Sequence, residues 1–213
     1  MGRRHCHLYV FEKRFVMNDA ASAAEAVKPE RKYSRGRLVT LALSLAVIAY
    51  AADQLTKWWV ETNMYEGEVI PVIPPILNWY FIRNPGAAFS IGTEFTWVFS
   101  LLMAFVFVLV LFLLRKLGSL WWAVALGGLL GGVAGNLTDR LFRPPSFLNG
   151  HVVDFISVPN FAIFNIADSF IVCSMIGVCL LMFVGRKIDG SKESEHDDAA
   201  SASVEGSGEA GRD

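Results

Sequence analysis

The segments Gly150-His151-Val152-Val153-Asp154-Phe155-Ile156 and Phe164-Asn165-Ile166-Ala167-Asp168 decide how this chain is organised. Each segment places one aspartate among apolar residues, where a bare carboxylate is costly and is usually kept for a function. The second aspartate also opens a hydrophobic run long enough to cross a membrane. Two carboxylates that meet can share a proton and activate a water molecule, so we ask whether the fold brings Asp154 to Asp168.

The composition indicates a membrane protein. The 213 residues are 54% hydrophobic and 18% charged, with a mean hydropathy of +0.42, which is too apolar for an ordinary soluble domain. The net charge of -1 provides no basic surface for nucleic acid. We expect Cys173 and Cys179 to face lipid or pack between helices, without a disulfide. No group of residues has the spacing of metal ligands, so we expect neither a metal nor another cofactor.

Four apolar runs predict four transmembrane helices, at Leu38 to about Val60, Phe95–Leu114, Trp121 to about Leu137, and Ile166 to about Val184. Residues 69–76 and 77–82 are β-prone, and their prolines exclude a helix. We expect short edge-type strands there, on the membrane surface. The predicted fold is therefore an all-α membrane core of four helices with a small extracytoplasmic β-rich region.

Basic residues lie before the first run, between the second and third, and after the fourth. They are Lys28, Arg31, Lys32, Arg35, Arg37, Arg115, Lys116, Arg186, Lys187 and Lys192. Lys and Arg are enriched in cytoplasmic loops, so this pattern predicts a multi-pass cell-membrane protein with both termini in the cytoplasm. The loops 61–94 and 138–165 then face outward.

The chain is expected to have three parts. Residues 1–37 form a disordered cytoplasmic extension ending in a basic anchor, and Met17 within it offers an alternative translation start. Residues 38–187 form the membrane domain, and residues 188–213 form a disordered acidic cytoplasmic tail, because they have almost no apolar content to bury.

The polar residues of the membrane region converge on the outer side of this topology. They are Asp53, Lys57, Asn84, Asn136, Asp139, Arg140, Asp154, Asn165 and Asp168. Asp53 and Lys57 have the i,i+4 spacing of a pair, and Asn165 is placed to cap the fourth helix with Asp168 in its first turn. The extended segment around Asp154 would let the loop fold back toward Asp168.

Simpler interpretations exist for several of these residues. Asp53 and Lys57 could be a structural ion pair, and Asn136, Asp139 and Arg140 could only link helices. The glycines at 127, 128, 131, 132 and 135 indicate close helix packing, and His151 is expected at the surface.

At these residues the chain resembles the lipoprotein signal peptidases, or signal peptidase II, of bacteria. The resemblance covers roughly residues 38–187 and rests on five motifs in the family's order. They are Asp53-Gln54-Leu55-Thr56-Lys57, Asn84-Pro85-Gly86-Ala87-Ala88-Phe89, Gly135-Asn136-Leu137-Thr138-Asp139-Arg140, Gly150-His151-Val152-Val153-Asp154-Phe155, and Phe164-Asn165-Ile166-Ala167-Asp168.

The resemblance implies a membrane aspartic endopeptidase that cleaves the signal peptide from prolipoproteins, just before a cysteine carrying a diacylglyceryl group. It implies Asp154 and Asp168 as the catalytic pair. Residues that would shape the site or hold substrate are Asp53, Lys57, Asn84, Asn136, Asp139, Arg140 and Asn165. It also implies inhibition by the cyclic peptide globomycin, and an active site near the outer leaflet.

Two other functions remain open at this point. A small proton-coupled transporter or channel could use the same carboxylates as relays, although a transporter should place some of them near the midplane. A structural membrane scaffold is the third hypothesis, and it gives no reason for two aspartates flanking one short loop.

Overall fold

The computed structural model describes residues 33–86 and 95–191. Four helices dominate this part of the chain: α2 (Arg35–Asn63), α3 (Thr96–Leu113), α4 (Leu120–Phe142) and α5 (Ile166–Phe183). The short 3-10 helix η3 (Leu114–Lys116) continues α3. All four helices are long and apolar enough to cross a membrane, as predicted. The predictions for residues 1–32, including Met17, and for residues 192–213 concern parts of the chain outside the described residues.

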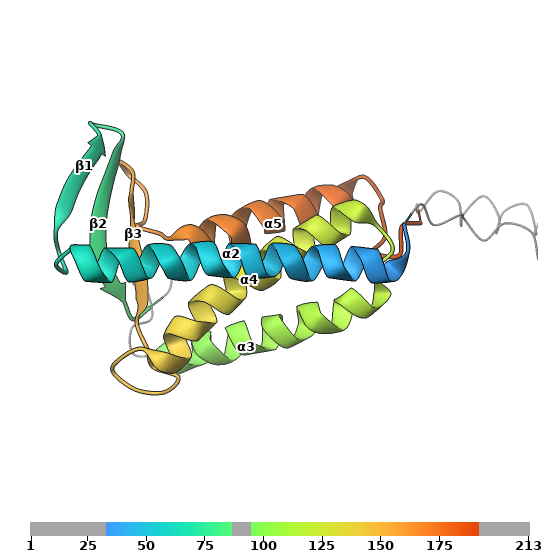
Figure 1. Ribbon diagram of the computed structural model, residues 1–213, viewed down its shortest axis with the longest axis horizontal. Helices are drawn as coiled ribbons and strands as arrows, with labels where there is room; N and C mark the ends of the chain where they lie inside the picture. The colour runs from blue at the N-terminus through green and yellow to red at the C-terminus, as the bar shows by residue number, and fades with distance from the viewer. Residues whose placement is uncertain (1–32, 87–94, 192–213) are drawn as a thin grey trace, which may run out of the picture. The chain divides into compact units, whose positions relative to one another are not determined.

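Helix α4 is the centre of the bundle and packs against α2, α3 and α5 (Figure 1). It is mostly buried, whereas the other three helices leave most of their apolar surface uncovered. Large side chains such as Phe105 on α3 and Phe183 on α5 point outward, with 64% and 88% of their surface exposed. Such extensive apolar exposure fits a surface covered by lipid. Cys173 and Cys179 are exposed on α5 without a disulfide, as predicted.

Glycines explain how α4 approaches its neighbours so closely. A Cβ at Gly127 or Gly131 would lie 2.6 or 2.5 Å from a backbone oxygen of α2, and a Cβ at Gly132 would lie 2.6 Å from the Ala167 oxygen of α5. One stripe of glycines therefore contacts α2, and a neighbouring stripe contacts α5. This confirms the prediction of close helix packing.

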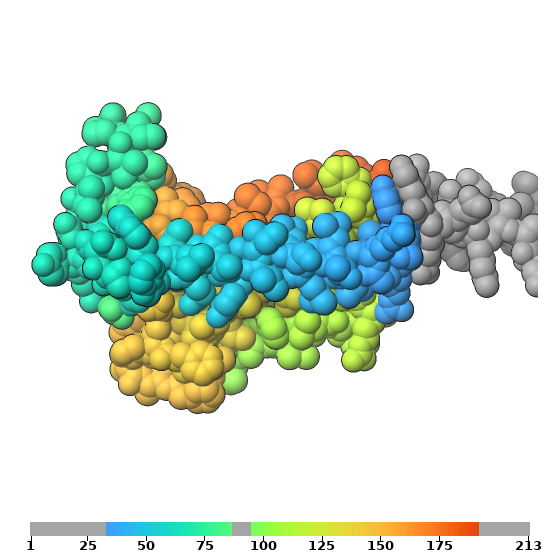
Figure 2. All heavy atoms as spheres, in the orientation of Figure 1, coloured from blue at the N-terminus to red at the C-terminus, as the bar shows by residue number. Residues whose placement is uncertain are grey.

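A three-stranded antiparallel sheet lies at one end of the bundle, in the order β1 (Val69–Ile73), β2 (Leu77–Asn84), β3 (Val152–Ser157). Figure 2 shows β1 and β2 projecting beyond the helices at this end. The predicted strands exist, but the edge-type assignment is wrong for β2. The segment around Asp154 supplies a third strand, which pairs with β2 and makes it central.

The sheet brings sequence-distant residues together at the helix ends. In the β2–β3 register Ile82 faces Asp154 and Asn84 faces Val152. After β3 the chain reverses, and Phe164 exchanges backbone hydrogen bonds with Ile156. This return places the start of α5 beside β3, as the extended segment predicted. Helix α4 continues to Phe142, past its predicted end at about Leu137, because the polar groups of its last turns find partners.

The helix contacts predict a sharp difference between two glycines. Gly131→Ala should lower thermal stability by about 1–3 kcal/mol, because the new methyl group must push the backbone of α2 away. Gly177→Ala on α5 is the matched control, since its Cβ would meet only the Ala125 methyl at 3.7 Å. Thermal unfolding of both variants in one detergent measures the difference. Equal stabilities would show that the α2–α4 contact is not tight.

Candidate active site

A buried ammonium group anchors the polar cluster between the helices and the sheet. The Nζ of Lys57 lies 2.8 Å from a carboxylate oxygen of Asp53, 2.8 Å from one of Asp139, and 2.9 Å from Oδ1 of Asn136. Lys57, Asp53 and Asp139 are fully buried. The three donors of the ammonium therefore each have an acceptor, which offsets the cost of burying its charge.

The two carboxylates extend this anchor to other elements. Asp53 accepts a hydrogen bond from the backbone N–H of Ala167 at 2.9 Å, at the start of α5. Asp139 accepts one from Val153 N–H at 3.3 Å, on β3. The ion group of Asp53, Lys57 and Asp139 thus joins α2, α4, α5 and β3, and it fixes the two segments that carry Asp154 and Asp168.

Asn165 connects the two candidate catalytic residues. It is the N-cap of α5 and forms a capping box with Asp168, in which each side chain accepts from the other's backbone N–H. Its side-chain amide donates to Oδ1 of Asp154 at 2.7 Å and to Oδ1 of Asn136 at 3.1 Å. The predicted cap is confirmed, and the same asparagine also contacts Asp154.

The carboxylates of Asp154 and Asp168 are held by neutral amides. Asn84 donates to Asp154 at 2.9 Å, and Asn136 donates to Asp168 at 2.7 Å. Within the described residues neither carboxylate forms an ion pair, in contrast to Asp53 and Asp139. Neutral partners orient a carboxylate without neutralising it, so a proton can still be gained or lost there.

The pKa of Asp154 is raised to about 7. Burial of the carboxyl group is the largest cause, and the negative charge of Asp168 is the second. The hydrogen bonds from Asn84 and Asn165 and the charge of Lys57 act in the opposite direction. Asp154 is only 2% exposed, and it lines the same cavity of about 360 Å³ as the partly exposed Asp168. A carboxyl group with a pKa near neutrality can give or take a proton during a reaction.

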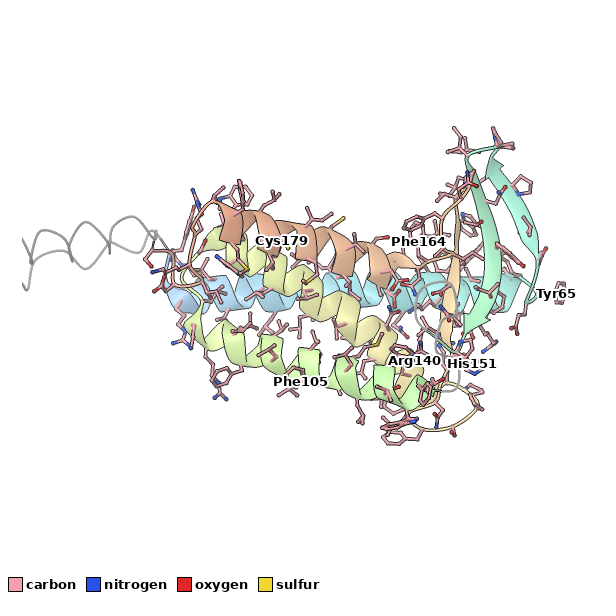
Figure 3. All side chains as sticks on the ribbon, turned by 180° about the vertical axis from the view of Figure 1, so that it is seen from behind. Tyr65, Phe105, Arg140, His151, Phe164 and Cys179 are labelled. Carbon is pink, nitrogen blue, oxygen red and sulfur yellow. The ribbon has the colours of Figure 1, made fainter. Side chains whose placement is uncertain are left out.

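Arg140 fastens the loops around this cavity. Its guanidinium donates to the backbone oxygens of Asn84, Pro85 and Gly150 at 3.2, 2.9 and 3.1 Å, and to that of Gly86. Only 1% of Arg140 is exposed, and Figure 3 shows it with His151 where the helices meet the sheet. Arg140 therefore connects the end of β2 to the loop before β3.

His151 was expected at the surface, but it is half-buried. Burial lowers the pKa of its imidazole.

The nine predicted site residues all lie in this cluster. Further charged residues that extend the cluster were not predicted from the sequence, among them Arg143, Glu61 and Arg83. Arg143 pairs with Asp139 at 2.6 Å and with Glu61, and Glu61 pairs with Arg83 at 3.0 Å. The i,i+4 spacing of Asp139 and Arg143 could have predicted their ion pair, whereas the contacts of Glu61 depend on tertiary structure. In the described ranges no three His, Cys, Asp or Glu side chains are placed to hold a metal ion.

The fold and the site define a polytopic membrane protein with paired carboxylates at one end of its helix bundle. A family model described as signal peptidase (SPase) II matches residues 45–184. The chain belongs to the signal peptidase II family.

Curated relatives agree with this assignment. The chain is 45% identical over 177 residues to the lipoprotein signal peptidase of Leifsonia xyli subsp. xyli, covering 83% of this chain and 82% of that protein. It is 48% identical over 158 residues to the lipoprotein signal peptidase of Streptomyces griseus, covering 74% and 81%.

Solved structures show the same fold. Two structures of bacterial membrane enzymes, at 2.3 and 1.9 Å resolution, match with TM-scores of 0.60 and 0.57 and sequence identities of 30% and 31%. Each match covers 71% of this chain, and 90% and 95% of the respective structures.

The contacts of Arg140 predict a large effect of its removal. Arg140→Ala should lower the free energy of unfolding by about 3 kcal/mol or more, because four backbone oxygens lose a buried donor. The control is Arg83→Ala, which breaks partly exposed ion pairs with Glu61 and Glu66 and should cost less than about 1 kcal/mol. The free energies of unfolding of the two variants are measured in detergent. Equal losses would contradict the role of Arg140 in holding the loops together.

Proposed function

We propose that this chain is an aspartic endopeptidase that removes the signal peptide from diacylglyceryl-modified prolipoproteins, cutting just before the lipidated cysteine. Asp154 and Asp168 are its catalytic pair. The observation that carries this proposal is their joint position on one cavity, each held by neutral amides and joined through Asn165. Family membership supports the substrate class, and the carboxylate geometry supports the aspartic chemistry.

The two carboxylates take different parts in the reaction. Asp168 lies in the first turn of α5, where the helix dipole stabilises a negative charge, so it is suited to be the base. Asp154, with its raised pKa, is suited to hold the shared proton. Asp168 takes a proton from water as the water oxygen attacks the scissile carbonyl carbon. Asp154 donates its hydrogen bond to the carbonyl oxygen, and the proton that Asp168 took from water then passes to the leaving nitrogen as the C–N bond breaks.

The remaining seven residues hold this pair in place. Asn84, Asn136 and Asn165 orient the carboxylates, and the ion group of Asp53, Lys57 and Asp139 fixes the elements that carry them. Arg140 fastens the loops at the cavity. No metal or other cofactor takes part in this scheme.

The cavity also suits a substrate that stays anchored in lipid. Phe164, Ile171 and Val172 line it beside Asp168, and Val172 is 56% exposed on the side of α5 that would face the bilayer. Acyl chains of the substrate can therefore remain in the membrane while the peptide reaches Asp154. A cyclic peptide such as globomycin would inhibit by occupying the same cavity.

The distribution of charge supports a plasma-membrane topology with cytoplasmic termini. Arg35, Arg115, Lys116 and Arg186 belong to the bundle end opposite the sheet (Figure 1). By the excess of Lys and Arg in cytoplasmic loops, that end is cytoplasmic and the active site is near the outer leaflet. Residues 38–187 then form the peptidase domain, flanked by cytoplasmic segments 1–37 and 188–213.

A proton-coupled transporter is less well supported. The residues of α4 that are buried between Trp122 and Val133 are all apolar or glycine, so this described stretch offers no titratable relay. The carboxylates instead gather at one end of the bundle.

The direct experiment incubates the purified protein with a diacylglyceryl-modified prolipoprotein and with the same precursor lacking the lipid. We expect a cut just before the cysteine of the lipidated precursor only, seen by mass spectrometry. Loss of cleavage in EDTA, restored by a divalent ion, would contradict the two-aspartate mechanism.

The pKa of Asp154 predicts a pH dependence of the rate. The active form holds one proton on the pair, and that proton leaves as the pH rises through about 7. This pKa belongs to the free protein, so we expect kcat/KM to fall on the alkaline side of neutrality. Turnover measured from pH 5 to about 9 tests this, with precursor binding followed separately. A rate that rises steadily across the range would show that the doubly ionised pair is active.

A further inference from the structure

A second cavity lies at the bundle end opposite the catalytic pair. Beyond α5 the chain reverses, and residues 185–191, the C-terminal turn, pack against the α3–α4 junction. The Ile188 oxygen accepts from Gly118 N–H at 2.9 Å, and the Arg186 oxygen accepts from the Trp122 indole at 2.9 Å. A Cβ at Gly118 would lie 2.1 Å from the Asp189 oxygen, so only glycine permits this contact.

The C-terminal turn, the end of α3, η3, α4 and α5 line an open cavity of about 600 Å³. Leu113, Val178 and Met182 give the cavity an apolar wall, and Lys116, Arg186 and Lys187 give it a basic rim. The three basic side chains are exposed, and within the described residues none of them forms an ion pair. They outnumber the one lining carboxylate, Asp189, which accepts hydrogen bonds from Ser191.

We propose that this cavity binds an anionic phospholipid, with the phosphate at the basic rim and an acyl chain along the apolar wall. Lys and Arg attract anionic headgroups at the membrane surface, and the rim lies where a spanning helix ends. The apolar wall continues into the lipid-facing surface of α5, so an acyl chain can enter without leaving the bilayer. The lipid holds the C-terminal turn against the α3–α4 junction.

The acidic residues that follow the turn are a poorer match for the cavity. Residues 192–213 carry the required negative charge, but Val204 is their only large apolar side chain. They could neutralise the rim without covering Leu113, Val178 and Met182. A phospholipid supplies both the charge and the hydrocarbon.

The test is lipid titration of the full chain in detergent, followed by native mass spectrometry, with phosphatidylglycerol and phosphatidylcholine of identical acyl chains. We expect phosphatidylglycerol to bind at least about fivefold more tightly. Arg186→Gln/Lys187→Gln should weaken its binding by at least about fivefold, since each basic group near the surface contributes roughly that factor. Arg35→Gln/Arg37→Gln, which removes two exposed charges at the same bundle end but outside the cavity, should change binding by less than about twofold.

Three results would overturn the proposal. They are equal binding of the two lipids, equal losses in the two double variants, and phosphatidylglycerol binding that appears only after residues 192–213 are deleted. The last result would make the acidic segment the occupant. Prolipoprotein cleavage by both double variants in detergent should stay unchanged, because the cavity is remote from Asp154. The lipid site and the peptidase function can therefore fail independently.

Discussion

The ammonium group of Lys57 is the constraint on which the site depends. A buried cation without acceptors would be severely destabilising, and here three oxygens surround it at 2.8 to 2.9 Å. Those oxygens belong to α2 and α4, and the same carboxylates also bind backbone N–H groups of α5 and β3. The close helix approach that the glycines permit is what brings these partners within reach of Lys57.

The four carboxylates of this cluster have two kinds of partner, charged side chains and neutral amides. Asp53 and Asp139 are paired with Lys57, and Arg143 extends the alternating charges through Glu61 to Arg83 on β2. Asp154 and Asp168 contact amides instead. The negative charge of an ion-paired carboxylate is compensated by its partner, whereas neutral amides orient a carboxylate and leave its net charge in place. The pair proposed to be catalytic therefore differs in its partners from the two carboxylates that bind Lys57.

Much of this arrangement could be predicted from local sequence. The positions of the four helices followed from hydrophobic runs, the α5 cap followed from Asn165 and Asp168, and the nine residues predicted from the five motifs all lie in one cluster. Tertiary pairing was not predictable in the same way. The central position of β2 depends on β3, which begins only at Val152, beyond the whole of α3 and α4 in the chain. The contacts of Glu61 likewise require two distant arginines to meet it. The C-terminal turn depends on the absence of a Cβ at Gly118, which no sequence pattern indicated.

The central claim is that Asp154 and Asp168 work as one unit that shares a proton. A double-mutant cycle of the wild type, Asp154→Asn, Asp168→Asn and the double variant, assayed for kcat on lipidated precursor, tests it most directly. Each single change should remove nearly all activity, and the double change should add little, because residues that act as a unit are not additive. All four proteins should insert and unfold normally, since asparagine keeps the shape of aspartate. Substantial cleavage by either single variant at normal protein levels would contradict the assignment.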